Sequence, residues 1–433
     1  MTTKIHETLG LKIYRAVSRA SKPVANFVLE RRLKAGKEDG NRIDERRGVT
    51  GAARPDGIVV WVHGASVGES LSVLPLVQRL GELRSDINFL VTTGTVTSAK
   101  LMIERLPANA IHQYIPVDYP GYVDAFLEHW RPDAVFFIES EFWPNLIKKS
   151  RAATKFMALV NGRISPRSFE DWKRQPNSIR YLLSSFDMII AQDNNNAERL
   201  AHLSGANVKM FGNLKHAAVA LPACDNIVGE LRNAMGDRQV WLAASTHPGE
   251  EATIIGAHKA LQKTHPSIFT IIAPRHPERG AEIAALCEEA GLKVAQRSSS
   301  EPIAPKIDIY IADTLGELGI FYRLCDIAFV GGSLVEKGGH NPLEPARFGV
   351  AILHGPHIFN FAETYRDMRK PGGAALVRND RELAAAIRRL MADQKTRSAV
   401  STAAKDGAEE SAERVLNAFC DALLTGIPAT AKP

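Results

Sequence analysis

The chain has 433 residues, of which 45% are hydrophobic and 24% charged. This composition is typical of soluble globular proteins, and the length is sufficient for two domains. The four cysteines lie far apart, which excludes a disulfide framework and fits a reducing compartment. No apolar run approaches the roughly 18–20 residues that span a bilayer, and the N-terminus lacks the features of a signal peptide.

The net charge of +6 is concentrated in the first 37 residues, which carry nine lysines and arginines against Glu7 and Glu30. The rest of the chain is nearly neutral, so we expect no nucleic-acid partner. Apolar residues recur every three or four positions in this segment: Ile5, Leu9, Ile13, Val17, Ala20, Val24 and Val28. The pattern predicts an amphipathic helix. Such a helix either lies on an anionic membrane surface or packs its apolar stripe on the protein's own body.

From about residue 57 onward, short apolar runs alternate with amphipathic helical stretches. Runs rich in Val, Ile and Phe between helices are typical of a parallel sheet covered on both faces. The first five predicted strands occupy 57–63, 87–93, 134–140, 155–162 and 187–193. After a pause, five more occupy 240–245, 269–274, 309–313, 327–332 and 351–355, and the chain is helical from about 380.

This order predicts an α/β protein with two doubly wound, Rossmann-like domains and a cleft between them. The predicted boundaries are a basic amphipathic leader over 1–45, an N-terminal domain over 46–217, a linker over 218–235 and a C-terminal domain over 236–433. The C-terminal domain is expected to include the terminal helices.

Polar residues follow the carboxyl ends of several predicted strands, where ligands bind in doubly wound sheets. Two of these segments also fit helix capping. Ser66 and Glu69 have capping-box spacing, and so do Asn341 and Glu344, with Pro342 at the first helical position. Trp143 is interpreted as a core residue. His354 and His357 flank a Gly-Pro turn and are interpreted as loop histidines, so we predict no metal site.

The stretch GGSLVEKGGHNPLEPA, residues 331–346, combines two glycine pairs with several polar groups. Glycine lets a backbone approach a ligand closely. A helix starting at Asn341 would direct N–H groups at an anion, and Arg275 could add a cation. The stretch therefore predicts a phosphate cradle. The chain contains no GxGxxG, GxxxxGK[ST], HExxH or DxD motif.

Seven motifs together resemble the 3-deoxy-D-manno-octulosonic acid (Kdo) transferases of lipopolysaccharide biosynthesis. They are HGASVGE, ESEFWPNL, NGRIS, GNLK, STHPGEE, APRHPER and the stretch 331–346. The resemblance covers about residues 30–420. It implies a GT-B glycosyltransferase of the cell envelope that inverts at the anomeric carbon. The implied donor is CMP-Kdo, and the implied acceptor is a lipid A precursor, the tetraacylated disaccharide 4′-phosphate known as lipid IVA.

The resemblance also implies roles for individual residues. Glu69 is similar to the family's general base, while Glu139 and Lys215 resemble its transition-state stabilisers. The CMP-binding residues implied in this way are Pro274, Arg275, Gly316, Glu317, Leu318, Asn341, Pro342, Leu343 and Glu344. Further site contacts are expected at Ser66, Gly68, Glu141, His276, Gly338, Gly339 and His340. Neither a cofactor nor a metal is expected, because protein cations and amides can stabilise the departing phosphate.

The leader differs from many relatives, whose N-termini are more apolar and look like membrane anchors. Lys12, Arg15, Arg19 and Lys22 interrupt it here, which favours attachment at the cytoplasmic face of the inner membrane over a spanning anchor. Two alternatives remain: another GT-B enzyme that uses a UDP-sugar, or a non-catalytic membrane-surface binding protein. The sequence does not specify the number of Kdo units added, the acyl pattern of the acceptor, the oligomeric state or whether the leader spans the membrane or only lies on it.

Overall fold

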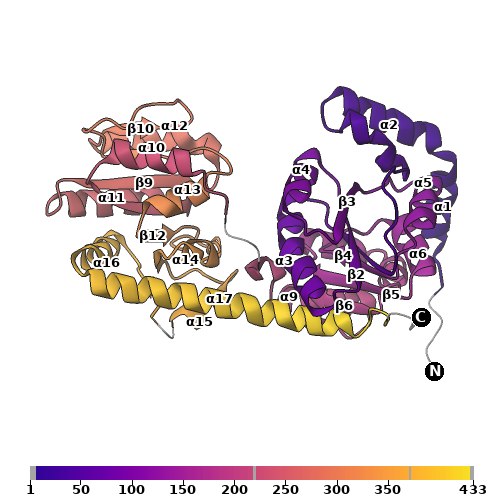
Figure 1. The fold of residues 1–433 in the computed structure, drawn as a ribbon. Helices are drawn as coiled ribbons and strands as arrows, with labels where there is room; N and C mark the ends of the chain where they lie inside the picture. Colours follow the sequence, from indigo (N-terminus) through magenta and orange to yellow (C-terminus); the bar gives the residue numbers. More distant parts are fainter. Residues whose placement is uncertain (1–5, 218–220, 370–371, 430–433) are drawn as a thin grey trace. The chain divides into compact units, whose positions relative to one another are not determined.

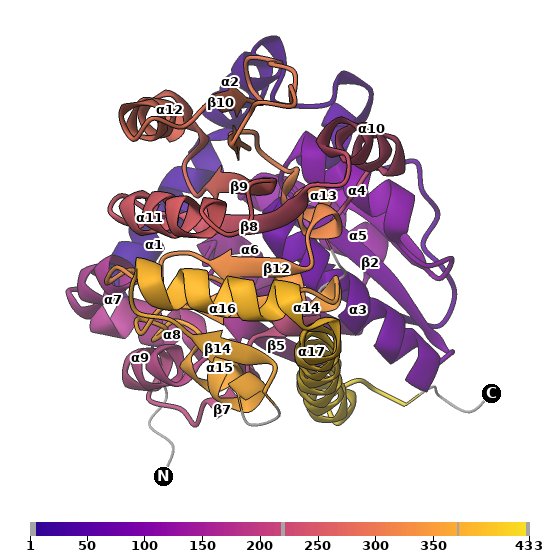
Figure 2. The same ribbon diagram turned by 90° about the vertical axis from the view of Figure 1, so that its left-hand side faces the viewer.

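The computed structural model describes residues 6–217, 221–369 and 372–429 (Figures 1 and 2). The chain forms two compact units. The first comprises Met1–Val219 with Ala412–Pro433, and the second comprises Ala220–Ser411. Each unit contains a seven-stranded sheet in which every pairing is parallel, with helices between the strands. The prediction of two doubly wound α/β sheets is confirmed.

The first sheet has the strand order β3-β2-β1-β4-β5-β6-β7. Its central strands are buried on both faces, as expected from their continuous apolar sequences. The strands are β1 (Ile58–His63), β2 (Ile87–Thr93), β3 (Ala110–Tyr114), β4 (Ala134–Ile138), β5 (Phe156–Gly162), β6 (Met188–Ala191) and β7 (Lys209–Met210). The helices that follow β1, β2, β4 and β6 are α3 (Val67–Leu83), α4 (Val96–Arg105), α6 (Pro144–Ala153) and α9 (Asn194–Ser204). Helix α5 (Pro120–Trp130) lies between β3 and β4 in the chain, and α7 (Pro166–Lys173) and α8 (Pro176–Leu183) lie between β5 and β6. The 3-10 helix η2 (Leu214–Ala217) follows β7.

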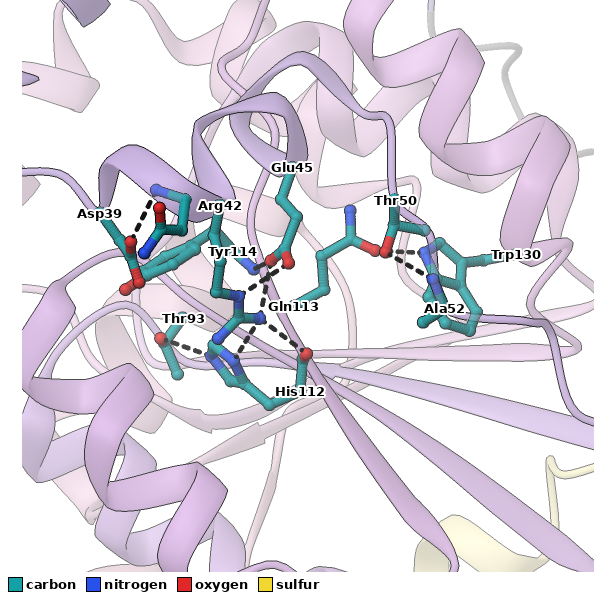
Figure 3. A network of polar contacts seen from close by, with 11 residues as sticks. Asp39, Arg42, Glu45, Thr50, Ala52, Thr93, His112, Gln113, Tyr114 and Trp130 are labelled. Atoms are coloured by element: carbon teal, nitrogen blue, oxygen red, sulfur yellow. Dashed lines mark hydrogen bonds and ion pairs between the residues drawn. The ribbon is translucent and has the colours of Figure 1, made fainter.

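The edge strand β3 is bonded by side chains from the 3-10 helix η1 (Gly40–Arg47), as Figure 3 shows. Glu45 accepts the backbone N–H of Tyr114 at 2.8 Å, and Arg42 donates to the carbonyl oxygen of His112 at 3.0 Å. Arg42 and Glu45 also pair with each other. An edge strand otherwise presents unpaired backbone groups that invite association with another chain. The segment before the sheet therefore covers one of its edges.

The leader forms two helices, α1 (Leu9–Ala20) and α2 (Lys22–Lys34), which meet at Ser21. Polar contacts hold α1 on the first unit. Tyr14 donates to Asp118 at 2.8 Å, and the Asn145 amide donates to the buried Ser18 hydroxyl at 3.1 Å. Thr8 and Ser178 hydroxyls are 2.8 Å apart. The helix thus faces the protein body with its polar side.

The apolar stripe of the leader consequently points away from the body. Leu9 is 73% exposed and Val17 64%, and on α2 Val24 and Phe27 are 61% and 65% exposed. This excludes the alternative that the stripe packs on the protein's own body. Ile5, at the start of the stripe, lies outside the described residues. None of the helices within the described ranges is both long and apolar enough to cross a bilayer.

The second sheet has the order β10-β11-β9-β8-β12-β13-β14. Its strands are β8 (Gln239–Thr246), β9 (Ile268–Pro274), β10 (Val294–Gln296), β11 (Ile309–Ile311), β12 (Ile327–Val330), β13 (Ala351–His354) and β14 (Ala374–Leu376). The helices are α10 (Asp225–Met235), α11 (Glu250–Gln262), η3 (Pro277–Arg279), α12 (Gly280–Glu289), α13 (Leu318–Leu324), α14 (Leu343–Arg347), α15 (Ala362–Arg369) and α16 (Asp380–Ala392). The last helix, α17 (Gln394–Leu424), begins in this unit and ends in the first.

All ten predicted strands are present, and the four that the sequence did not predict are β3, β7, β10 and β14. These four are the outermost strands of the two sheets. They have two to five residues and are only partly buried. Their sequences therefore lack the continuous apolar run that marks a central strand.

Two parts of the chain differ from the predicted boundaries. The predicted linker contains α10, whose Val228, Leu231 and Met235 are buried in the second unit. The predicted C-terminal domain extended to residue 433, whereas residues from Ala412 onward belong to the first unit. There Phe419 and Leu423 are fully buried against its sheet. The burial of these apolar side chains explains both differences.

Candidate active site

Glu69 lies in the first turn of α3, just beyond the carboxyl end of β1. The Ser66 hydroxyl accepts the Glu69 backbone N–H at 3.3 Å and donates to its Oε1 at 2.8 Å, while Oε2 accepts the Ala65 N–H at 2.7 Å. The capping interpretation is thus confirmed. Glu69 is only 9% exposed. Burial raises the pKa of its carboxyl, and the nearby charges of Glu139 and Glu141 raise it further against these hydrogen bonds.

Gly68 precedes Glu69, and a methyl group in place of its hydrogen would meet nothing within 4 Å. Packing alone therefore does not require glycine at this position. Ser66, by contrast, is fully used in the cap.

Glu139 follows β4 and forms an ion pair with Lys215, whose Nζ lies 2.5 Å from Oε1. The contact is an ion pair rather than a well-aligned hydrogen bond, because Oε1 has no donor in good geometry. Glu139 is buried, and its φ of 61° lies in the left-handed region that non-glycine residues rarely adopt. Such strain in a buried charged residue is a feature of functional sites.

Lys215 is positioned by two asparagines of the motifs NGRIS and GNLK. The side-chain Oδ1 of Asn213 accepts the Lys215 backbone N–H at 3.0 Å, and the Asn161 side-chain amide donates to the same oxygen at 3.1 Å. Asn161 also accepts the N–H of Leu214 at 2.8 Å. The end of β5 and the 3-10 helix η2 are therefore linked, and together they place the lysine beside Glu139.

His63 was not among the predicted site residues, although it ends β1 and begins the motif HGASVGE. Its ring is buried, and Nε2 lies 4.0 Å from the Glu141 carboxylate. Burial lowers the pKa of His63 to about 4, so the ring is neutral near pH 7. Nδ1 lies 3.0 Å from the Thr92 hydroxyl. The position of His63 at a strand end was the signal that could have identified it.

The same Glu141 oxygen, Oε2, also accepts a hydrogen bond from the Trp143 indole N–H at 2.6 Å. The interpretation of Trp143 as a core residue is wrong, because its side chain is 49% exposed. It precedes Pro144, the first residue of α6, and its ring stays at the surface of the site. The edge of the first sheet thus gathers Glu69, Glu139 and Glu141, one lysine and a neutral histidine.

The second unit presents a cation and imidazole rings at the corresponding edge of its sheet. Arg275 follows Pro274, the buried last residue of β9. Its side chain is exposed and has no ion pair with any described residue. His247 and His340 stack with parallel rings, their Nε2 atoms 2.9 Å apart, and His276 contacts His247 edge-on.

Both stacked histidines are neutral near pH 7. Burial is the main cause that lowers the pKa of His340 to about 4, and it also lowers the pKa of His247. The Arg275 charge adds to this effect on both rings. Imidazole rings that remain neutral beside an unpaired guanidinium can donate or accept hydrogen bonds without adding charge. The arrangement suits an anionic, hydrogen-bonding ligand.

Several backbone N–H groups of the glycine-rich stretch 331–346 are already bonded within the unit. Glu250 is fully buried, and its carboxylate accepts the N–H groups of Gly332, Ser333 and Leu334 at 2.7–3.0 Å. Gly339 donates to the Gly332 carbonyl oxygen at 2.7 Å. The Glu250 carboxylate therefore binds three N–H groups of this stretch that a phosphate could otherwise accept.

The glycines in this stretch are explained by close packing of backbone segments. A Cβ on Gly331 would lie 2.5 Å from the Ser245 carbonyl oxygen, and one on Gly338 would lie 2.4 Å from the Asn360 amide. Gly338 and Gly339 also have φ values of 90° and 72°, which favour glycine. The stretch brings His340 into contact with His247.

Helix α14 begins at Leu343 rather than at Asn341, and Pro342 is its N-cap residue. The Asn341 side chain accepts the Leu343 N–H at 3.1 Å and donates to Glu344 at 3.4 Å. Burial raises the pKa of Glu344. The predicted capping box is therefore wrong in its register, because Pro342 rather than Asn341 is the N-cap residue, although Asn341 still bonds the first N–H of this five-residue helix.

The predicted donor segment Gly316–Leu318 lies at the start of α13. Gly316 is exposed with a φ of 81°, and Leu318 is half-buried. The Glu317 carboxylate accepts two hydrogen bonds from Arg297, both 2.6 Å long, and Arg297 lowers its pKa. The Glu317 carboxylate is therefore bonded within the unit, and the Glu317 carbonyl oxygen accepts the Ile320 N–H at 2.9 Å, so the segment offers a ligand mainly its backbone N–H groups.

Comparisons with known proteins agree with these observations. Residues 41–218 match the family model of 3-deoxy-D-manno-octulosonic-acid transferase (kdotransferase), and residues 254–407 match that of glycosyl transferases group 1. The chain is 33% identical to a probable mitochondrial 3-deoxy-D-manno-octulosonic acid transferase of Arabidopsis thaliana, over 91% of each chain. It is 34% identical to the Bordetella pertussis 3-deoxy-D-manno-octulosonic acid transferase, over 92% of this chain and 95% of the relative.

Solved structures support the fold. A glycosyltransferase of Rickettsia africae superimposes with a TM-score of 0.58 at 11% identity, over 85% of this chain and 98% of the other. A putative UDP-N-acetylglucosamine 2-epimerase of Listeria monocytogenes gives 0.56 at 14% identity, over 85% and 97%. The chain has the α/β two-domain GT-B fold, as predicted.

Proposed function

Because the chain belongs to the 3-deoxy-D-manno-octulosonic acid transferase family of glycosyltransferases, we propose that it transfers Kdo from CMP-Kdo to the lipid A precursor lipid IVA. The observation that carries the proposal is the environment of Glu69. Its carboxylate is fixed by Ser66 and Ala65, nearly buried, and has a raised pKa. A general base works best when its pKa approaches the operating pH.

In this mechanism Glu69 accepts the proton of the attacking sugar hydroxyl. The hydroxyl oxygen forms a bond to the anomeric carbon of Kdo, and the bond from that carbon to the CMP phosphate oxygen breaks. Attack from the face opposite the leaving group inverts the anomeric configuration. The Glu139–Lys215 pair supplies a fixed positive and negative charge at the same sheet edge, where preorganised charges stabilise a charge that develops in the transition state.

The second unit would hold the CMP moiety. Arg275 is an exposed cation without a partner among the described residues, so it can pair with the phosphate. His340, the backbone N–H groups of Gly316–Leu318 and the segment Asn341–Glu344 would complete the contacts. The departing phosphate leaves as an anion beside this cation, and the mechanism uses no metal ion or other cofactor.

Association with an anionic membrane surface is part of the proposal, because the acceptor is a lipid. The exposed apolar side chains of α1 and α2 support it, together with the lysines and arginines beside them. Each cation near an anionic surface contributes about 1 kcal/mol. We place the enzyme at the cytoplasmic face of the inner membrane as a peripheral protein.

The direct test is incubation of the protein with CMP-Kdo and detergent-dispersed lipid IVA, with products identified by mass. The proposal predicts a Kdo-lipid IVA product, formed equally well in the presence of EDTA. A parallel incubation with UDP-sugars tests the alternative donor class. If product forms only with a UDP-sugar, the donor is a UDP-sugar and not CMP-Kdo. If no donor gives product, a non-catalytic binding protein is favoured.

A further inference from the structure

A cavity of about 280 Å³ lies between the leader helix α1 and helices α5, α6 and α8 of the first unit. Four cations line it, Arg15, Arg19, Lys148 and Lys149, against the single carboxylate of Glu7. The remaining walls include apolar groups such as Leu11, Pro144 and Leu182. The cavity is separate from the residues around Glu69, and the proposed reaction does not use it.

Two of the four cations have no carboxylate partner. Arg15 pairs with Glu7 at 3.1 Å, and Lys149 pairs with Asp124 at 2.5 Å. Arg19 forms no ion pair with any residue in 6–217, 221–369 or 372–429, and the same holds for Lys148. The cavity therefore retains uncompensated positive charge.

Lys148 is held away from bulk solvent by neutral groups. Its ammonium group lies 4.1 Å from the centre of the Tyr181 ring and donates to the Ser185 hydroxyl at 3.2 Å. Burial lowers its pKa. The charge of Glu7 acts against this shift without forming an ion pair with Lys148, and an anion bound beside the ammonium group would stabilise its charge further.

The position of the cavity beside α1 indicates whether such an anion is free in solution or attached to a lipid. Leu11, Arg15 and Arg19 line the cavity, while Leu9, Ile13 and Val17 form the exposed apolar stripe on another side of the same helix. When that stripe lies in the membrane interface, the cations on the side of α1 that faces the protein body are about one helix diameter (~10 Å) farther out, level with the lipid headgroups. An anion that reaches the cavity in this orientation is attached to a lipid.

We propose that this cavity binds the phosphate of an anionic membrane phospholipid, with Arg19 and Lys148 as the two cations that pair with it. The inference rests on the proposed membrane association and adds a specific headgroup site to it. The apolar walls would contact the glycerol carbons next to the phosphate. The phospholipid is a ligand distinct from the substrate of the transfer reaction.

The test measures binding of the full chain to two kinds of phosphatidylcholine vesicle. One contains phosphatidic acid and the other contains oleic acid, adjusted to the same surface potential. Diffuse attraction depends only on the potential and predicts equal binding. A phosphate site predicts that the wild-type protein binds the phosphatidic acid vesicles at least about tenfold more tightly.

Arg19→Gln removes an exposed cation that has no ion pair, so the fold should tolerate it. Its matched control is Arg31→Gln on α2, another exposed leader arginine, outside the cavity. The control should weaken binding to both vesicles by about fivefold and keep the preference, as expected for loss of one surface charge. Arg19→Gln should abolish the preference, and Lys148→Gln should do the same.

Equal effects of Arg19→Gln and Arg31→Gln, or no preference in the wild type, would overturn the site. Competition by millimolar inorganic phosphate at constant ionic strength would identify a free-anion site instead of a lipid site. Transfer of Kdo to detergent-dispersed lipid IVA by the wild-type protein is measured separately. If the protein forms Kdo-lipid IVA but does not prefer phosphatidic acid vesicles, only the headgroup site is contradicted. If it prefers these vesicles but forms no product, only the proposed reaction is contradicted.

Discussion

The two sheet edges share one architecture but carry opposite electrostatics. At the edge of the first sheet three glutamates gather, and burial with like charge raises the pKa of Glu69. At the edge of the second, Arg275 stands beside histidines whose pKa values are lowered. The contrast shows that a parallel sheet fixes where a site lies, while the residues after each strand decide its chemistry. One edge suits proton removal, and the other suits an anion.

The largest effect is expected for Glu69→Gln. Glutamine can still accept the Ala65 N–H or the Ser66 hydroxyl, so stability should change by less than about 1 kcal/mol. It cannot accept a proton, and turnover should fall by about 10²–10⁴-fold. Steady-state kinetics with CMP-Kdo and lipid IVA, with thermal unfolding as the control, measure both. Near wild-type turnover would leave Glu69 as a helix cap only.

Arg275→Ala should weaken donor binding at the edge of the second sheet. Loss of a charge-assisted hydrogen bond to phosphate costs about 1.5–3 kcal/mol, which corresponds to about 10–150-fold in donor KM. Turnover at saturating CMP-Kdo should change much less than KM if the contact acts mainly in binding. Arg366→Ala, on α15, removes another exposed arginine of the same unit and serves as the control. An unchanged KM would exclude Arg275 from the donor site.

Glu250→Gln tests whether the Glu250 carboxylate holds the glycine-rich stretch 331–346 in place at the edge of the second sheet. The carboxylate accepts four backbone N–H groups, and an amide nitrogen would face two of them. Each buried donor left without a partner costs about 1–3 kcal/mol. The midpoint of thermal unfolding should fall, and CMP affinity should fall with it because the glycine stretch moves. A wild-type midpoint would show that the carboxylate does not hold this stretch.

The smallest expected effect is a shift in pH dependence. Since burial raises the pKa of Glu69, the base becomes ionised at a higher pH than an ordinary glutamate. The rate should therefore fall as pH decreases through this raised pKa. A raised carboxyl pKa also means that the protonated form is favoured in the folded state, so this group lowers stability as pH rises through it. A kcat/KM profile from pH 4 to 8 (~0.5 steps) measures the acidic limb. A limb at the pKa of a free glutamate would contradict the environment described for Glu69.

The sequence predicted the sheets well because their central strands are continuous apolar runs. It missed β3 and the other outer strands, whose exposed residues dilute that signal. It placed Glu69, Glu139 and Lys215 at one site through motif resemblance, and the structure brings Glu139 and Lys215 into contact. The role of Glu250 could not be predicted, because a buried glutamate that binds a distant glycine stretch leaves no local pattern.

The comparison between the two edges is tested most directly by calorimetric titration of CMP into the Glu69→Gln and Arg275→Ala variants. The account predicts that Glu69→Gln binds CMP with wild-type affinity, because it changes only the edge that removes the proton. Arg275→Ala should bind CMP about 10–150-fold more weakly, as its phosphate contact is lost. Weakened binding in Glu69→Gln together with unchanged binding in Arg275→Ala would contradict the assignment of proton removal to one edge and donor binding to the other.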